Sequence, residues 1–153
     1  NFSKQMELPA HNSRVYPGGN RKNGNDSMIT IRNWQDVDPY VGHETAIIWP
    51  VFRAEGDADK TRNHQDDALF ITRGISGFTR HLMQAGKSGD YHDHEEIEQV
   101  YYIISGQGKM KLDGEIYPVR PGDTVHIPPK IKHQLINDGD EWIEHILISA
   151  PVR

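Results

Sequence analysis

Short strand-like runs separated by turn residues constrain the fold of this chain most strongly. Turn chemistry at Asp113-Gly114, at Pro121-Gly122 and across residues 137–140 favours hairpins between successive runs. The pattern predicts an all-β barrel or sandwich. The runs that we predict as strands are 28–31, 46–52, 77–83, 100–104, 109–112, 115–119, 124–127, 134–136 and 142–148.

The length of 153 residues fits one domain, and a hydrophobic content of 35% suffices for a core. Residues 1–27 are polar and rich in Gly and Asn, and they show no sustained period. We therefore expect an N-terminal arm at 1–27, disordered or wrapped around a second subunit, and one barrel domain at 28–153. The charged segment 54–67 has no apolar face and reads as a surface loop.

Charge and composition exclude several classes of partner. A net charge of -5 gives no basic surface for nucleic acid. No apolar run approaches the roughly 20 residues that span a bilayer, so we expect a soluble protein with no membrane partner. Composition leaves the compartment open, and the expected compartment is the cytoplasm. The chain has no cysteine. Any metal ligands must therefore be histidine, carboxylate or amide.

Three histidines have the spacing of a metal site. His92 and His94 lie two residues apart, and residues two apart on a strand point to the same face. A third histidine, His133, comes from a distant strand. Together with a nearby carboxylate or amide, they predict a site for one divalent transition metal.

The fourth ligand is either Glu98 or Gln99. These residues are adjacent, so only one of them can point toward the metal. Counting forward from His94 allows either one, because a bulge can absorb one residue. An amide would leave the ion with its full charge as a Lewis acid, whereas a carboxylate would suit Fe(II) oxygen chemistry better.

The two motifs resemble those of the cupin superfamily over about residues 77–149. The first motif places Gly86, His92, His94, a Glu or Gln, and Gly106; the second places Gly122, Pro128, His133 and Asn137. The second motif usually has a glycine where this chain has Lys130, so the turn there is expected to differ. The resemblance implies a jelly-roll barrel that holds one divalent ion, Fe, Zn, Ni or Mn.

The resemblance also favours Gln99 over Glu98. The usual ligand lies seven positions before the turn glycine, which from Gly106 is Gln99. The His-x-His followed by Glu-Gln is also similar to small cupins that open the rings of unsaturated uronates, in which an amide takes this position. The predicted ligands are thus His92, His94, His133 and Gln99, with Glu98 as the alternative.

Candidate catalytic groups lie near these ligands. If Gln99 faces inward, Tyr101 does too; if Glu98 does, Tyr102 does. Either phenol could serve as acid or base near the cation, or simply pack. His145 could relay protons or pack, and His126 is treated in the same way. Arg80 could bind a substrate carboxylate, although a surface role is commoner.

These features predict a metal-dependent enzyme that acts on a small polar organic substrate. The expected chemistry is Lewis-acid activation of the isomerase, lyase or ring-opening type. Two alternatives stay open: an Fe(II)-dependent dioxygenase and a non-enzymatic protein that binds a small ligand. We also expect a homodimer, in which the arm covers an exposed sheet edge.

Overall fold

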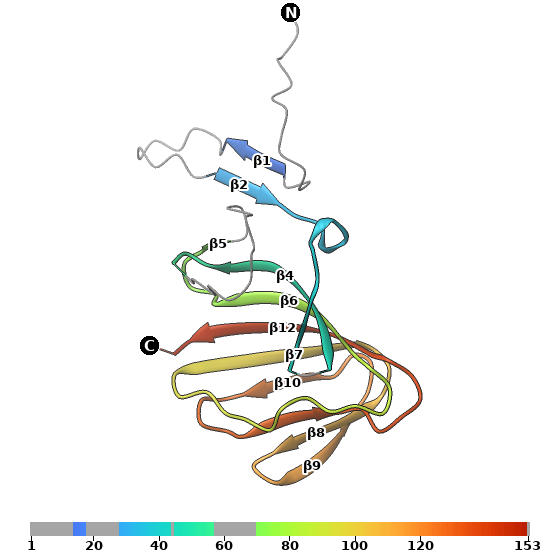
Figure 1. Ribbon diagram of the computed structural model, residues 1–153. Helices are drawn as coiled ribbons and strands as arrows, with labels where there is room; N and C mark the ends of the chain where they lie inside the picture. Colours follow the sequence, from blue (N-terminus) through green and yellow to red (C-terminus); the bar gives the residue numbers. More distant parts are fainter. Residues whose placement is uncertain (1–13, 18–27, 44, 57–69, 153) are drawn as a thin grey trace, which may run out of the picture.

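The computed structural model describes residues 14–17, 28–43, 45–56 and 70–152 (Figure 1). Strands account for most of these residues, with one short 3-10 helix. The elements are β1 (Arg14–Pro17), β2 (Met28–Ile31), η1 (Trp34–Asp36), β3 (Tyr40–Gly42), β4 (Ala46–Ala54), β5 (Phe70–Thr72), β6 (Gly77–Met83), β7 (Ile97–Ser105), β8 (Gly108–Leu112), β9 (Glu115–Val119), β10 (Thr124–Ile127), β11 (His133–Ile136) and β12 (Ile143–Pro151).

Two sheets form a jelly-roll barrel. The larger has the order β10-β7-β12-β6-β4-β3, with β5 pairing parallel to β4, and the smaller has the order β11-β8-β9. Every other pairing between described strands is antiparallel. Strands β1 and β2 form a separate two-stranded sheet, which Figure 1 shows beyond the β4 side of the barrel. The predicted all-β barrel is confirmed.

The barrel interior is built by alternation along the strands. Every second residue of β6, beginning with Gly77, is buried, and β12 alternates in the same way from Ile143 to Leu147. Such a period of two is what a sheet with one inward face requires. The core comprises Ala46, Ile48, Met83, Tyr101, Ile103, Met110, Val119, Ile127, Leu135, Ile143 and Leu147.

Most of the predicted strands are present, and β2, β6, β9 and β10 have the predicted bounds. Three short strands were not predicted from the sequence: β1, β3 and β5. Strand β1 falls inside the predicted arm, whose other residues lie outside the described part of the chain. The predicted loop at 54–67 lies outside it from residue 57 onward. Among the described residues, no helix has the length and apolarity needed to cross a membrane.

Candidate metal centre

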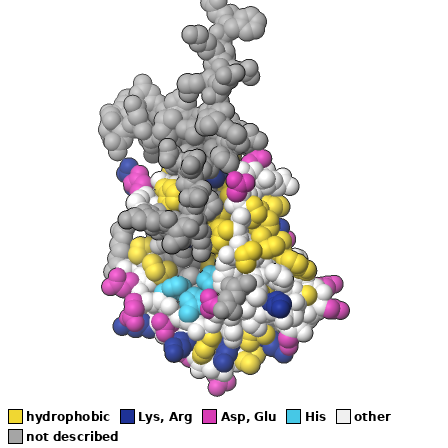
Figure 2. All heavy atoms as spheres, in the orientation of Figure 1, with side chains coloured by type: hydrophobic (Ala, Val, Ile, Leu, Met, Phe, Trp, Pro, Cys, Tyr) yellow, Lys and Arg dark blue, Asp and Glu magenta, His cyan; other side chains and the backbone are white. Residues whose placement is uncertain are grey.

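His92, His94 and His133 converge inside the barrel. One ring nitrogen from each lies within 4.8 Å of the others. The ring centroid of His92 lies 4.9 Å from that of His94 and 4.5 Å from that of His133. Figure 2 shows histidine side chains gathered on one face of the molecule. The short distances between these ring nitrogens suit three imidazoles that share one small cation.

Backbone hydrogen bonds fix two of the histidines relative to each other. His92 and His133 form an isolated antiparallel bridge, in which His133 N–H donates to the His92 carbonyl at 2.8 Å and His92 N–H donates back at 3.2 Å. His133 begins β11, whereas His92 precedes β7 in an extended segment outside the named strands. These main-chain hydrogen bonds therefore hold the backbones of His92 and His133 side by side.

The turn before β11 positions His94. Lys130 N–H donates to the His94 carbonyl at 2.7 Å. Lys130 has a φ of 68°, in the left-handed region that glycine favours. Lysine at this position thus keeps the backbone conformation of a glycine, and the turn still holds His94 in place.

Hydrogen bonds leave a lone pair on each Nε2 atom. The Nδ1–H of His92 donates to the Asp90 carbonyl at 3.2 Å, and that of His133 donates to the Ile131 carbonyl at 3.0 Å. A carbonyl only accepts, so the proton of each neutral ring lies on Nδ1 and Nε2 is free to act as a ligand. Within the described part of the chain, the buried Nε2 of His133 has no hydrogen-bond partner.

Gln99 faces the triad and Glu98 faces away from it. The Gln99 side chain is buried, and its amide nitrogen donates to Nε2 of His94 at 3.1 Å. Its buried Oε1 has no hydrogen-bond partner among the described residues. A half-turn of the amide exchanges the two atoms and brings Oε1 to the triad. Glu98 instead contacts Nε2 of His126 at 3.0 Å on the exposed face.

Electrostatics favour the neutral form of two of the three histidines, His133 and His94. The pKa of His133 is lowered to about 4, mainly by burial; a backbone hydrogen bond to Ile131 opposes this shift, and the nearby histidines add to it. Burial also lowers the pKa of His94, with His92 as the next cause. Neutral rings present lone pairs to a cation at neutral pH. Unpartnered buried acceptors at His133 and Gln99 are what a divalent ion would satisfy, so these residues fit the metal that the fold implies.

A second group of histidines lies deeper in the barrel. His145 and His81 are buried with ring centroids 4.9 Å apart, and His145 stacks on Tyr101 at 5.1 Å. His81 contacts the Thr79 hydroxyl at 2.8 Å. Burial lowers the pKa of His145 to about 3 and raises that of Tyr101. At neutral pH both histidines are therefore neutral, and the phenol keeps its proton.

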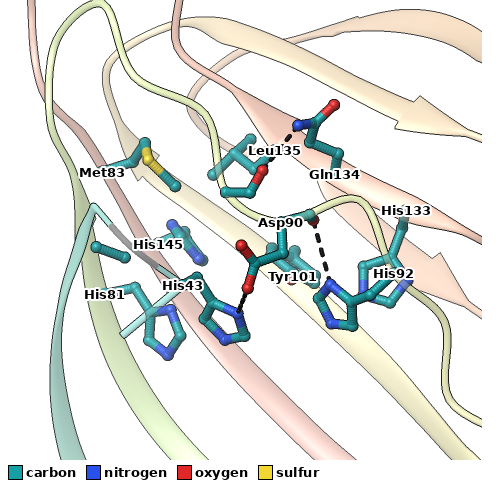
Figure 3. A pocket seen from close by; sticks show the side chains of 12 residues that line it. His43, His81, Met83, Asp90, His92, Tyr101, His133, Gln134, Leu135 and His145 are labelled. Atoms are coloured by element: carbon teal, nitrogen blue, oxygen red, sulfur yellow. Dashed lines mark hydrogen bonds and ion pairs between the residues drawn. The ribbon is translucent and has the colours of Figure 1, made fainter. Parts of the chain in front are cut away.

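His43 links the two groups. Its ring stacks on His92 at 5.4 Å, and Nδ1 lies 3.4 Å from the Asp90 carboxylate (Figure 3). His43, His81, His92, Tyr101, His133 and His145 line one shared pocket. Sequence reasoning missed His43 and His81. The signal for His81 was available, because it alternates with Gly77, Thr79 and Met83 on the inward face of β6.

The structure does not bring the other predicted residues to the triad. Tyr102 is 45% exposed on the outer face of β7. This follows from Gln99 facing inward, because the alternation then turns Tyr102 out. Arg80 also lies on the outer face, where it pairs with Glu144 at 2.7 Å and lies 3.8 Å from the Trp34 ring centroid. Of the two roles considered for Arg80, its position therefore fits the surface role and not one in the barrel cavity.

Comparison with known proteins agrees with this geometry. The cupin domain family matches residues 79–149. An uncharacterized protein of Methanocaldococcus jannaschii is 37% identical over 129 residues, which cover 81% of this chain and 91% of that protein. The chain belongs to the cupin superfamily. A predicted oxalate decarboxylase from Thermotoga maritima has the same fold, with a TM-score of 0.62 at 17% identity over 78% of this chain and 97% of its own.

Some of the relatives have a named activity. A glucose-6-phosphate isomerase of Pyrococcus abyssi is 38% identical over 127 residues, or 74% of this chain. The chain spans only 59% of that isomerase. The likeness therefore covers about three quarters of this chain and leaves the rest of the isomerase unmatched.

Proposed function

We propose that this cupin is a metal-dependent enzyme that isomerises a small polar molecule bearing hydroxyl and carbonyl groups. One divalent ion would be held by His92, His94, His133 and Gln99. The observation that carries the proposal is the donor set, which offers three neutral imidazoles and an amide oxygen without a hydrogen-bond partner among the described residues. When bound, an ion among neutral ligands keeps its charge and polarises substrate oxygens as a Lewis acid.

The protein side chains would move and hold protons around the substrate. Tyr101 is buried and its raised pKa keeps the phenol protonated, so it would donate a hydrogen bond to a substrate oxygen. His145 stacks on Tyr101 and has a buried Nδ1 with no partner in the described structure. A neutral imidazole in this place can accept a proton. The His43–Asp90 pair would supply a second acid or base at the pocket wall.

Sugar phosphates are the first substrates to test. The likeness to the Pyrococcus isomerase over 74% of this chain supports this choice. Aldose–ketose isomerisation also needs the features present here: a cation for two adjacent oxygens and a group that carries a proton between carbons. Lyase and ring-opening reactions use the same activation on other substrates.

The test is anaerobic turnover of fructose 6-phosphate by protein loaded with Mn²⁺, Ni²⁺ or Zn²⁺. NMR would follow both product and solvent deuterium incorporated at the carbon that loses its proton. The proposal predicts metal-dependent conversion that His133→Ala abolishes. Turnover that requires Fe²⁺ and consumes O₂ would support a dioxygenase instead. Ligand binding without any turnover would support a non-enzymatic module.

We also propose that the chain forms a homodimer. Tyr102 and Ile104 leave apolar surface exposed on the outer face of β7, with 45% and 38% of each residue accessible. Burying such surface against a second copy is favourable. Light scattering of the chain with and without residues 1–27 would test both the dimer and the contribution of the arm. A monomer in both cases would contradict the proposal.

A further inference from the structure

A polar recess beside the metal centre contains an arginine. The recess encloses about 640 Å³ including its open mouth, and His94 and Gln99 form part of its wall. Arg53, Tyr40, Ser76 and Ser149 also line it, together with Ile48, Ile97, His43, Thr79, His81 and Leu147. We refer to this space as the Arg53 recess.

A β-bulge turns Arg53 toward the interior. Strand β4 pairs Pro50 with Thr79 and Phe52 with Phe78, so the register shifts by one residue between Pro50 and Phe52. A bulge reverses the inward and outward alternation beyond it. Arg53 consequently pairs with Gly77 and shares its inward face. Regular alternation from Ile48 would have pointed Arg53 to the outside.

The absence of a side chain at Gly77 makes room for the guanidinium. A Cβ atom at this glycine would lie 3.4 Å from Nη1 of Arg53 and 3.3 Å from Oγ of Ser149. Nη2 of Arg53 donates to the Tyr40 hydroxyl at 3.0 Å. The guanidinium therefore lies over Gly77 of β6, and the Tyr40 hydroxyl holds it by a hydrogen bond. Its charge also reaches His81, as one of the smaller causes of that residue's lowered pKa.

The charge of Arg53 has no counterion among the described residues. Tyr40 is neutral, and no described carboxylate lies within ion-pair distance of Arg53. A half-buried guanidinium costs free energy unless an anion or water compensates its charge. Its fork of N–H donors matches the oxygens of a carboxylate or a phosphoryl group. An unpaired arginine facing the recess thus suits an anionic ligand.

The register of the sheet connects Arg53 to the metal centre. Gln99 pairs with Ser149, Ser149 with Gly77, and Gly77 with Arg53, so the four residues form one row across β7, β12, β6 and β4. Neighbouring strands lie about 4.8 Å apart, which puts Gly77, below the guanidinium, about 10 Å from Gln99. A molecule that presents oxygens to the metal and carries an anionic group several bonds away would fill this distance.

We infer that Arg53 binds the anionic end of the substrate, a phosphoryl or carboxylate group, while the opposite end lies at the triad. The inference rests on the proposed function for the role of the triad. It narrows the substrate class to small polyhydroxylated organic anions and adds a specificity-determining residue. Tyr40 positions the guanidinium and has no direct part in the chemistry.

Calorimetry with charged and neutral probes tests the inference. Fructose 6-phosphate, gluconate and uncharged fructose are titrated into Mn²⁺-loaded protein, as wild type, Arg53→Gln and Arg53→Lys. We expect at least one anion to bind about tenfold or more tighter than fructose, and Arg53→Gln to remove that advantage. Arg53→Lys should keep part of it, because lysine retains the charge and loses the fork. The anion that binds more tightly shows whether the site prefers a phosphoryl or a carboxylate group.

Arg73→Gln is the matched control, since Arg73 is exposed and pairs only loosely with Glu55 at 3.5 Å among the described residues. This variant should bind every probe as the wild type does. Equal affinity of wild type and Arg53→Gln for both anions would overturn the inference. So would the failure of both anions to bind the wild type more tightly than fructose. Circular dichroism melts of each variant exclude misfolding as the cause.

Metal removal separates this inference from the proposed function. After chelation, inorganic phosphate should still bind the wild type and should bind Arg53→Gln about tenfold more weakly. Metal content should be the same in both proteins. If no metal binds at the triad while phosphate binding still depends on Arg53, the proposed function fails and the anion site stands. If metal binds normally but phosphate binding does not depend on Arg53, the inference about the anion site is wrong and the proposed function is unaffected.

Discussion

The amide nitrogen of Gln99 lies 3.1 Å from Nε2 of His94, whereas the neighbouring Glu98 contacts His126 on the opposite face of β7. This relationship selects which of two adjacent side chains can act as the fourth ligand. It also gives the proposed centre a neutral donor set. The charge at this single position is therefore the most direct way to alter the chemistry of the site.

Gln99→Glu should tighten divalent metal binding and slow Lewis-acid turnover, each by about 10- to 100-fold. The carboxylate adds a favourable charge for the cation and lowers the net charge available to polarise a substrate. Metal affinity by competition with a chelator, and turnover at saturating metal, measure the two effects. Glu98→Gln is the matched control and should change neither quantity by more than about twofold. Equal effects of both substitutions would contradict the assignment.

His133→Ala should abolish stabilisation by metal. A ligand that binds only the folded state at about 100 times its Kd stabilises it by about 2.7 kcal/mol. Thermal unfolding with and without Mn²⁺ or Ni²⁺ should show this gain for the wild type and for His126→Ala, because His126 is exposed and contacts Glu98. The gain should be absent in His133→Ala. A metal-induced rise in Tm that survives this substitution would place the ion elsewhere.

Metal-free protein should lose stability as the pH falls below about 6.5. Burial lowers the pKa of His145 to about 3 and that of His81 well below its usual value, so the unfolded chain binds more protons in this range. Stability then increases with pH from about 3 to about 6.5, by on the order of 1 kcal/mol per pH unit for each such histidine.

Urea unfolding at pH 7.5, 6.0 and 5.0 measures this slope. His145→Leu removes one buried titrating group and should give a shallower dependence on pH than the wild type. An identical slope for the variant would show that burial of His145 does not control acid stability.

Gly106→Ala should be strongly destabilising. Gly106 has a φ of 77°, and a Cβ atom there would lie 2.3 Å from the Trp142 carbonyl oxygen, so both the backbone conformation and the close approach require glycine. The conformational part alone costs about 1–3 kcal/mol. Gly114→Ala is a matched control: its φ is 91°, but among the described residues no atom beyond its two chain neighbours lies within 4 Å of the added Cβ. Urea denaturation should show the larger loss for Gly106→Ala.

The sequence could predict the barrel because its signals are local. Alternating apolar residues and turn dipeptides lie next to each other in the chain, and β6, β9 and β10 have the predicted bounds. The convergence of His92, His94 and His133 was also predictable, since two of them are neighbours and the third belongs to a motif of fixed spacing.

The position of Arg53 could not be predicted in the same way. It depends on the bulge between Pro50 and Phe52, and a one-residue shift in register leaves no clear trace in the sequence. For Arg80 the sequence left both faces of the strand open, with the surface role as the commoner one. Phe78, Arg80 and Leu82 share one face of β6, and Trp34 and Trp49 cover the arginine on that outer face. Such covering residues come from distant parts of the chain.

Crystals grown with one equivalent of Mn²⁺ or Ni²⁺ would test the central claim most directly through anomalous scattering. We expect a single strong peak about 2.1 Å from Nε2 of His92, His94 and His133, with Oε1 of Gln99 turned toward it. A site elsewhere on the chain, or three imidazoles with no peak between them, would contradict the account.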